Sequence, residues 1–382
     1  MNFDLSDEQR LLQRTVREFA QSEVAPRAAE MDRLHEFPYD LVEKMAGLGL
    51  MGLPWPEQYG GAGADTISYA IAVEEIARAD ASTGITLAAH VSLGSTPFYL
   101  FGTEEQKQQY LVPLAQGTRL WAFGLTEPEA GSDAGATRTR ADLRDGAWVI
   151  DGSKCFITNS GTRITGGVTI TAVTGSLPDG RNEISNIIVP TGTPGFAVEP
   201  PYSKMGWRAS DTHGLTFADC RVPEQNILGR RGRGYQQFLQ TLDGGRISVA
   251  ALSVGLAQAC LDASLAYATQ RRQFGQPIGK FQAIQFKLVD MATEIEMARL
   301  MTYKAAWLKD RGRDFSLAAG MAKLYASETS KRAADQAVQI HGGYGFMDEY
   351  PVSRYYRDCK VNEIGEGTSE VQRLVIAKQL GL

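Results

Sequence analysis

Three long helical stretches in the C-terminal part of the chain restrict its fold more than any other feature. They run near 235–270, 281–310 and 316–341, and a shorter one follows at 369–380. Three long helices and a short one are typical of a four-helix bundle. We therefore expect residues 229–382 to form a C-terminal helical bundle domain.

The N-terminal part of the chain is also helical in its pattern. Ser6 and Gln9 form a capping box in front of a segment with one apolar face. Further helices are predicted at 38–47, 66–79 and 104–116. This pattern predicts an N-terminal α-helical domain at 1–120.

Between 121 and 228 the sequence changes to short β-type runs separated by Asp, Gly, Asn and Pro. The runs are 148–150, 156–158, 168–173, 184–189 and 215–217. Such runs are typical of a small antiparallel β-barrel or sandwich. The predicted fold class is therefore α+β, with this middle β domain at 121–228 between two helical domains.

Charge and composition argue against several function classes. The 382 residues carry a net charge of −5, so nothing directs the whole molecule onto nucleic acid or an anionic membrane. Four widely spaced cysteines without Cys-x-x-Cys, and four histidines without His-x-x-x-His, predict neither a metal site nor a disulfide framework. We interpret the most apolar stretch, 247–261, as too short to span a bilayer. No signal or transit pattern is recognised, so we expect a cytoplasmic protein.

Gly47, Gly49 and Gly52 match the spacing of the dinucleotide-binding fingerprint. Their context differs, because they end a predicted helix and lead into Leu53-Pro54 instead of joining a strand to a helix. We interpret them as a helix end and a turn.

Glu366 is the strongest candidate for a catalytic group. It lies between two glycines, which let a backbone approach a ligand closely, and Thr368 or Ser369 can cap the helix that follows. A carboxylate in this position would suit a catalytic base. A solvent-exposed Gly-Glu-Gly turn is the alternative, and the local pattern alone favours it.

Three further motifs have ordinary structural alternatives. The small-residue run 126–135 could be a cofactor loop or a surface loop, and the segment 339–345 could be a plain helix C-cap with glycine in the left-handed conformation. Asp243 and Arg246, three residues apart on one helix face, are interpreted as a surface ion pair when taken alone.

Taken together, these segments resemble the acyl-CoA dehydrogenase family over essentially the whole chain. The resemblance rests on residues 125–135, 271–275, 281–282, 339–343, 356–358 and 366–370 in that order, and the remaining motifs are most similar to the short-chain, butyryl-CoA dehydrogenase-like branch. It implies the same three-domain fold, FAD as cofactor and an acyl-CoA thioester as substrate.

The resemblance also implies a role for individual residues. Glu366 matches the catalytic base, and no residue is implied as a metal ligand. The residues implied to bind FAD are Phe123, Leu125, Thr126, Gly131, Ser132, Phe156, Ile157, Thr158, Arg271, Phe274, Gln282, Gln339, Ile340, His341, Gly342, Gly343, Thr368, Ser369 and Glu370. Those implied to contact the substrate are Ser132, Asp243, Arg246 and Gly367.

The implied reaction is α,β-dehydrogenation to trans-2-enoyl-CoA, as in fatty acid β-oxidation. Glu366 takes the α-proton while the β-hydride leaves for flavin N5, and burial strengthens the carboxylate as a base. Electrons would pass to an electron-transfer flavoprotein. The residues from 271 to 343 resemble contacts made from a neighbouring subunit, which implies a homo-oligomer, most often a tetramer.

Two positions depart from the family pattern. Phe156 stands where many members have tryptophan beside the flavin, and Gly365 replaces the tyrosine that commonly precedes the base. Gly245 occupies the position of the relocated base in the isovaleryl-CoA branch, so Glu366 is the candidate that remains. We hypothesise that Gly365 widens the acyl pocket. A flavin acyl-CoA oxidase and a catalytically silent acyl-CoA-binding relative are the rival functions.

Overall fold

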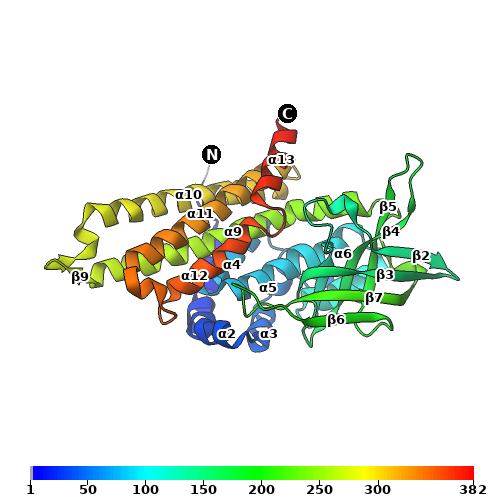
Figure 1. Ribbon diagram of the computed structural model, residues 1–382, viewed down its shortest axis with the longest axis horizontal. Helices are drawn as coiled ribbons and strands as arrows, with labels where there is room; N and C mark the ends of the chain where they lie inside the picture. The colour runs from blue at the N-terminus through cyan, green and yellow to red at the C-terminus, as the bar shows by residue number, and fades with distance from the viewer. Residues whose placement is uncertain (1–2) are drawn as a thin grey trace.

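The computed structural model describes residues 3–382. Figure 1 shows an elongated molecule in which a helical body occupies one side and a β-sheet the other. The N-terminal helices are α1 (Asp7–Phe19), α2 (Ala28–Leu34), α3 (Tyr39–Gly47), α4 (Thr66–Ala79), α5 (Ala81–Ala89), α6 (Thr96–Phe101), α7 (Glu104–Gln106) and α8 (Val112–Ala115).

The predicted capping box at the start of α1 is confirmed. The Ser6 hydroxyl accepts from the Gln9 amide at 3.1 Å, and the Ser6 amide donates to the Gln9 side chain at 3.0 Å. The Gln9 side chain also donates to Asp65, and Asp65 in turn caps α4 by accepting from the Ser68 amide at 2.7 Å. Local capping therefore also fixes how α1 lies beside α4.

The helix predicted at 104–116 is interrupted by a π-helical turn over Lys107–Leu111 between α7 and α8. Pro113 lies in the first turn of α8. It has no N–H to donate, and its ring would clash with the carbonyl four residues earlier in a regular helix. The regular hydrogen-bond pattern therefore changes before Pro113.

The middle of the chain forms an eight-stranded sheet that is mostly antiparallel, with the order β6-β7-β3-β2-β4-β5-β8. The predicted antiparallel arrangement fails at two strand pairs, because β1 and β2 both pair in parallel with β4. The chain enters β1 from the helical body, so its direction is set by that junction and not by a hairpin. The strands are β1 (Leu120–Gly124), β2 (Arg140–Arg144), β3 (Ala147–Thr158), β4 (Thr165–Ser176), β5 (Asn182–Pro190), β6 (Phe196–Pro201), β7 (Thr212–Pro223) and β8 (Ile227–Leu228).

The C-terminal region consists of three long helices and two shorter ones. The predicted long helices are found within one residue of their expected limits. The elements are α9 (Gly234–Gln270), the small hairpin β9 (Arg272–Gln273) and β10 (Gln276–Pro277), α10 (Gln282–Asp310), α11 (Ser316–His341), α12 (Pro351–Cys359) and α13 (Ser369–Gln379). In Figure 1, α13 projects from the helical body beside the sheet.

The helix α9 runs through the centre of the helical body and packs against α4, α10 and α11. Among the described residues it is the one helix long and apolar enough to cross a membrane, but 72% of its apolar window is buried inside the protein. Burial against other helices, and not shortness, is therefore the reason for its apolar character. The expectation that 247–261 is too short to span a bilayer is not met, because the helix that contains this stretch has 37 residues.

The N-terminal and C-terminal helices share one hydrophobic core, while the sheet has a second core of its own. The helix α12 is fixed to its surroundings by polar contacts: Arg357 pairs with Asp32 of α2 at 2.5 Å, and Asp358 accepts from the Trp207 amide at 2.7 Å. These contacts hold the segment that leads from α12 to Glu366.

Candidate active site

Glu366 lies in the connection between α12 and α13, in a backbone conformation that non-glycine residues rarely adopt. Its φ is +55°, and that of Gly367 is +97°. Such a conformation costs about 1–3 kcal/mol and is typically kept at functional sites. Immediately afterwards Thr368 caps α13, its hydroxyl accepting from the Val371 amide at 3.2 Å. The prediction of a capped helix here is confirmed, with Thr368 and not Ser369 as the cap.

The carboxylate of Glu366 is buried and points toward α9. Both of its oxygens are inaccessible to solvent and accept no hydrogen bond from any described residue. A Cβ built on Gly245 would lie 2.0 Å from Oε2, so the glycine provides the space that the carboxylate occupies. The solvent-exposed carboxylate that the local pattern favoured is therefore wrong, because the end of the Glu366 side chain packs against Gly245 of α9, while the backbone around it stays partly exposed.

Burial raises the pKa of Glu366 to about 7, although the Lys323 ammonium and the Arg246 guanidinium act in the opposite direction. A carboxyl group with a pKa near neutrality is matched to accepting a proton at physiological pH.

Two side chains hold the backbone around Glu366, a role that the sequence did not predict for either of them. Gln372 donates to the carbonyls of Glu366 at 3.2 Å and Gly367 at 3.1 Å, and Lys323 donates to the Gly367 carbonyl at 2.7 Å. The signal for Lys323 is its position among the small buried residues Ala319 and Ala326 of α11, where a lysine is out of place.

The ion pair of Asp243 with Arg246 is confirmed, but it does not lie on the surface. Arg246 is only 4% exposed, and its Nε has no hydrogen-bond partner among the described residues. Burial raises the pKa of Asp243, while Arg246 lowers it. A buried guanidinium with a free donor beside Glu366 is suited to a polar ligand.

The loop 125–135 is held by a buried ion pair that the sequence did not reveal. Glu127 accepts from Lys154 at 2.7 Å, from the Thr137 hydroxyl and from the Arg138 amide at 2.7 Å. Burial would raise the pKa of Glu127, but Lys154 and these hydrogen bonds lower it to about 2. Burial lowers the pKa of Lys154 to about 8, against the effect of Glu127. Glu127 therefore has a structural role. Lys154 compensates its negative charge, so Glu127 opposes an anionic ligand at this loop less than an unpaired carboxylate would.

The residues proposed to hold the flavin ring lie on the sheet side of the molecule. Phe123 stacks on Phe238 of α9, with ring centroids 5.2 Å apart. Phe156 has a φ of +61° and is 66% exposed, and its ring contacts Tyr202. A large aromatic ring held outward by a strained backbone provides a surface for a flat ligand. Gly131 and Ser132 are exposed, Leu125, Thr126 and Thr158 are partly buried, and Ile157 is buried.

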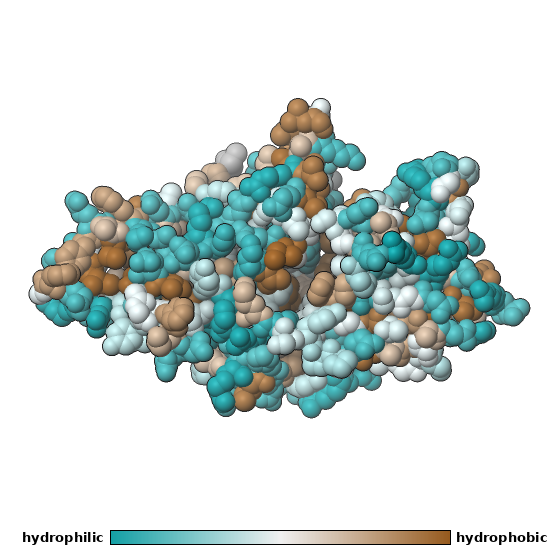
Figure 2. Space-filling view, in the orientation of Figure 1, coloured by the Kyte–Doolittle hydropathy of each residue, from teal (hydrophilic) through white to brown (hydrophobic). Residues whose placement is uncertain are grey.

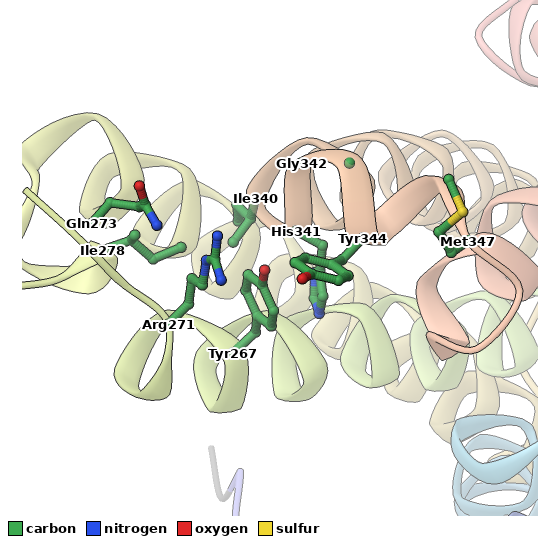
Figure 3. Close-up of a pocket in the computed structure, with 10 residues that line it drawn as sticks. Tyr267, Arg271, Gln273, Ile278, Ile340, His341, Gly342, Tyr344 and Met347 are labelled. Carbon is green, nitrogen blue, oxygen red and sulfur yellow. The ribbon is translucent and has the colours of Figure 1, made fainter.

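A second group of predicted cofactor residues surrounds a cavity of about 610 Å³ at the other end of α9. Arg271, Ile340, His341, Gly342 and Gly343 all line it. Figure 3 shows Arg271 and Tyr267, from the end of α9, beside the turn that follows α11. Phe274 is 92% exposed nearby, while Gln282 and Gln339 are exposed and do not line the cavity.

The turn after α11 is not the predicted left-handed C-cap. Gly342 has a φ of +62° but a ψ of −137°, which lies outside the left-handed helical region. A Cβ on Gly342 or Gly343 would meet no atom within 4 Å, so the backbone is open on its outer side. Together with the nearby Arg271 side chain, this open turn fits a nucleotide with its phosphates.

The two groups cannot hold one FAD molecule within a single chain. Phe238 and Arg271 lie at opposite ends of α9, and at 1.5 Å per residue about 50 Å separate them, more than an FAD molecule spans. Each group alone is suited to part of the cofactor, one to the flavin and the other to the nucleotide.

The fold and these residue groups define a three-domain flavoprotein oxidoreductase with FAD as its cofactor. Family models of the N-terminal, middle and C-terminal domains of acyl-CoA dehydrogenases match residues 6–118, 122–220 and 232–381. The chain therefore belongs to the acyl-CoA dehydrogenase family.

Relatives of known name and structure agree over the full length. The chain is 60% identical to a probable acyl-CoA dehydrogenase, YngJ, of Bacillus subtilis, with all of both chains covered. It is 44% identical to butyryl-CoA dehydrogenase from Megasphaera elsdenii, with a TM-score of 0.97 and all of both chains covered. A structure described as the electron transferring flavoprotein of Acidaminococcus fermentans contains a chain that is 46% identical, with a TM-score of 0.97, covering 100% of this chain and 99% of that one.

Proposed function

We propose that the protein oxidises an acyl-CoA thioester to the trans-2-enoyl-CoA, with Glu366 as the base. The observation that carries this proposal is the Glu366 carboxylate, which is buried without a hydrogen-bond partner among the described residues and has its pKa raised to about 7 by burial. A carboxylate that is not already hydrogen-bonded is free to accept a proton from carbon.

Glu366 removes a proton from the carbon next to the thioester carbonyl. The pair of electrons left on that carbon forms the new double bond as the β-carbon loses a hydride. Bound FAD supplies the two-electron acceptor for that hydride. The backbone N–H of Glu366 would donate to the thioester oxygen, where negative charge develops. The pair of Asp243 and Arg246 would orient the CoA portion, and Ser132 and Gly367 would make further contacts to the substrate.

Binding of FAD is assigned to the two groups at the ends of α9, each from a different subunit. Phe123 and Phe156 with their neighbours would hold the ring, while Arg271 and the 339–343 turn would hold the tail. Thr368, Ser369 and Glu370 start α13, where free helix amides add donors. We therefore propose a homo-oligomer, with the tetramer as the expected form. Figure 2 shows hydrophobic surface at the end near β9 and on α13. Phe274, next to β9, and Leu374 of α13 are 92% and 70% exposed. Light scattering of the holoprotein measures the oligomeric state and tests the proposed tetramer.

The substrate is proposed to be a short acyl-CoA whose acyl group can be bulkier than butyryl. Similarity to butyryl-CoA dehydrogenase supports the short chain. A Cβ on Gly365 would contact only the Val361 carbonyl, at 3.4 Å, so this position offers room that a tyrosine would fill. Comparing kcat/KM for butyryl-, isobutyryl-, hexanoyl- and octanoyl-CoA tests the idea. A sharp optimum at butyryl-CoA contradicts the wider pocket, whereas Gly365→Tyr should shift the preference toward butyryl-CoA.

The electron acceptor is proposed to be an electron-transfer flavoprotein, as in fatty acid β-oxidation. The similarity to a chain in a structure described as an electron transferring flavoprotein supports this choice. An oxidase on the same scaffold would instead pass electrons to oxygen. Reoxidation of the reduced flavin by air and by an electron-transfer flavoprotein, measured side by side, separates the two functions.

The decisive variant is Glu366→Gln, which removes the base and changes the shape of the side chain very little. We expect it to keep the yellow colour and to bind acyl-CoA, but to lose at least about 10²-fold in the rate of flavin reduction. Anaerobic rapid mixing with acyl-CoA measures that rate. Reduction at the normal rate would remove Glu366 from the mechanism, and a colourless protein that cannot be reconstituted with FAD would favour a silent relative.

A further inference from the structure

Lys323 of α11 is a buried charge that the proposed reaction does not yet use. Lys323 is fully buried, with an exposed fraction of 0%. Within residues 3–382 its ammonium makes one hydrogen bond, to the carbonyl of Gly367 at 2.7 Å. Burial of an ammonium group is costly unless an opposite charge or further acceptors compensate for it. A buried lysine at this position therefore needs an opposite charge close to it. The residue directly before its hydrogen-bond acceptor Gly367 is Glu366.

Glu366 acts on Lys323 through its charge and not through a hydrogen bond, because both carboxylate oxygens lack a hydrogen-bond partner among the described residues. Burial lowers the pKa of Lys323 to about 8, and Glu366 is the largest influence in the opposite direction. In return, Lys323 is the largest influence that lowers the pKa of Glu366 against its burial. The other ionisable groups that act on this pair are Arg246 of α9, Tyr69 of α4, and Glu363 and Glu370 on either side of Glu366.

We propose that Lys323 is a positioning residue for Glu366: it anchors the backbone at Gly367 and supplies the fixed positive charge that keeps the carboxylate ionised before the reaction. This inference rests on the proposed role of Glu366 as the base. The proton moves from the substrate carbon to Glu366, and Lys323 keeps its own protons throughout.

The two effects of Lys323 can be separated by experiment. The hydrogen bond to Gly367 stabilises a backbone with positive φ at two successive residues, so its loss would misplace the base at every pH. The charge acts only on the equilibrium between the ionised and the protonated carboxyl group. Loss of the charge raises the pKa of Glu366, so that less of the base is ionised at neutral pH and activity returns only as the pH rises.

The test compares wild-type holoprotein with Lys323→Met, which has a similar length and no charge, and Lys323→Arg, which keeps the charge. Anaerobic flavin reduction at saturating butyryl-CoA is followed across pH. For Lys323→Met we expect the midpoint of the acidic limb to move up by about one pH unit, the low end for an adjacent opposite charge. For Lys323→Arg we expect the same midpoint as in the wild type, but a lower maximal rate of flavin reduction.

The matched control is Lys331→Met, which removes an exposed lysine two turns further along the same helix. Its midpoint should equal that of the wild type. Infrared difference spectra of the oxidised protein across pH, with Glu366→Gln as the reference, report the protonation of Glu366 without any turnover and should show the same shift.

The result that overturns the proposal is an unchanged midpoint in Lys323→Met by both measurements. If that variant yields no holoprotein, a shifted midpoint in Lys323→Arg overturns it instead, and an unchanged one supports it. Failure of the proposed function looks different: wild-type flavin would not be reduced by acyl-CoA, or Glu366→Gln would be reduced at the normal rate.

Discussion

The glycine that faces Glu366 allows a sharp test of the geometry of the site. In Gly245→Ala the new Cβ would lie 2.0 Å from Oε2 of Glu366, whereas Cβ contacts below 3.0 Å essentially never occur. The carboxylate oxygen therefore has to move by at least about 1 Å, a displacement that costs about 10²-fold in rate when it misplaces a catalytic group. This loss corresponds to about 2.7 kcal/mol of barrier.

The fold should tolerate this substitution, because the obstructed atom is the end of a flexible side chain. Alanine in place of glycine inside α9 is favourable by about 1 kcal/mol. Gly244→Ala is the matched control, since its Cβ would meet only the Lys309 ammonium, at 3.5 Å. Both variants should melt at or above the wild-type temperature, and only Gly245→Ala should lose flavin reduction in anaerobic rapid mixing. A normal rate in Gly245→Ala would show that the carboxylate does not act from the position described.

Two further predictions concern stability. In Lys154→Met the carboxylate of Glu127 is left buried without its cation, which should cost about 3–5 kcal/mol of stability and lower the melting temperature of the holoprotein. The double variant with Glu127→Gln should recover part of that loss. A single variant that melts like the wild type would contradict the ion pair. His213 lies between the Asp211 carboxylate at 2.8 Å and the Glu199 carbonyl at 2.6 Å, and Asp211 raises its pKa above 6.5. Its stabilisation is therefore fully present below pH 6.5 and is lost as the pH rises through the raised pKa, so His213→Gln should lower the melting temperature more at pH 5.5 than at pH 8.5. An equal decrease at both values would refute a charged His213.

The sequence predicted elements well where the signal is local and periodic. The expected stretch 235–270 is the helix Gly234–Gln270, and the capping pattern placed the start of α13 because its donors and acceptors lie within three residues. Glu366 stood out because of its flanking glycines. The burial of Glu366 was not predictable, because it depends on Gly245 of α9, which lies 121 residues earlier in the chain.

The contacts that tune the site were not predictable for the same reason. Lys154 and Glu127 are 27 residues apart, and Lys323 and Gly367 are 44 apart, so no local pattern joins them. A charged residue among small apolar ones is the signal in the sequence that indicates such a contact. The interruption at Lys107–Leu111 was not predicted, because the helical pattern continues on both sides of Pro113 and indicates one continuous helix.

The length of α9 makes retention of FAD a matter of mass action. In the homo-oligomer proposed above, the two ends of α9 belong to different FAD sites, so loss of one subunit would remove one group of contacts from each FAD that it shares. Dilution should therefore release flavin and separate subunits together, and added FAD should favour the assembled form by the same linkage.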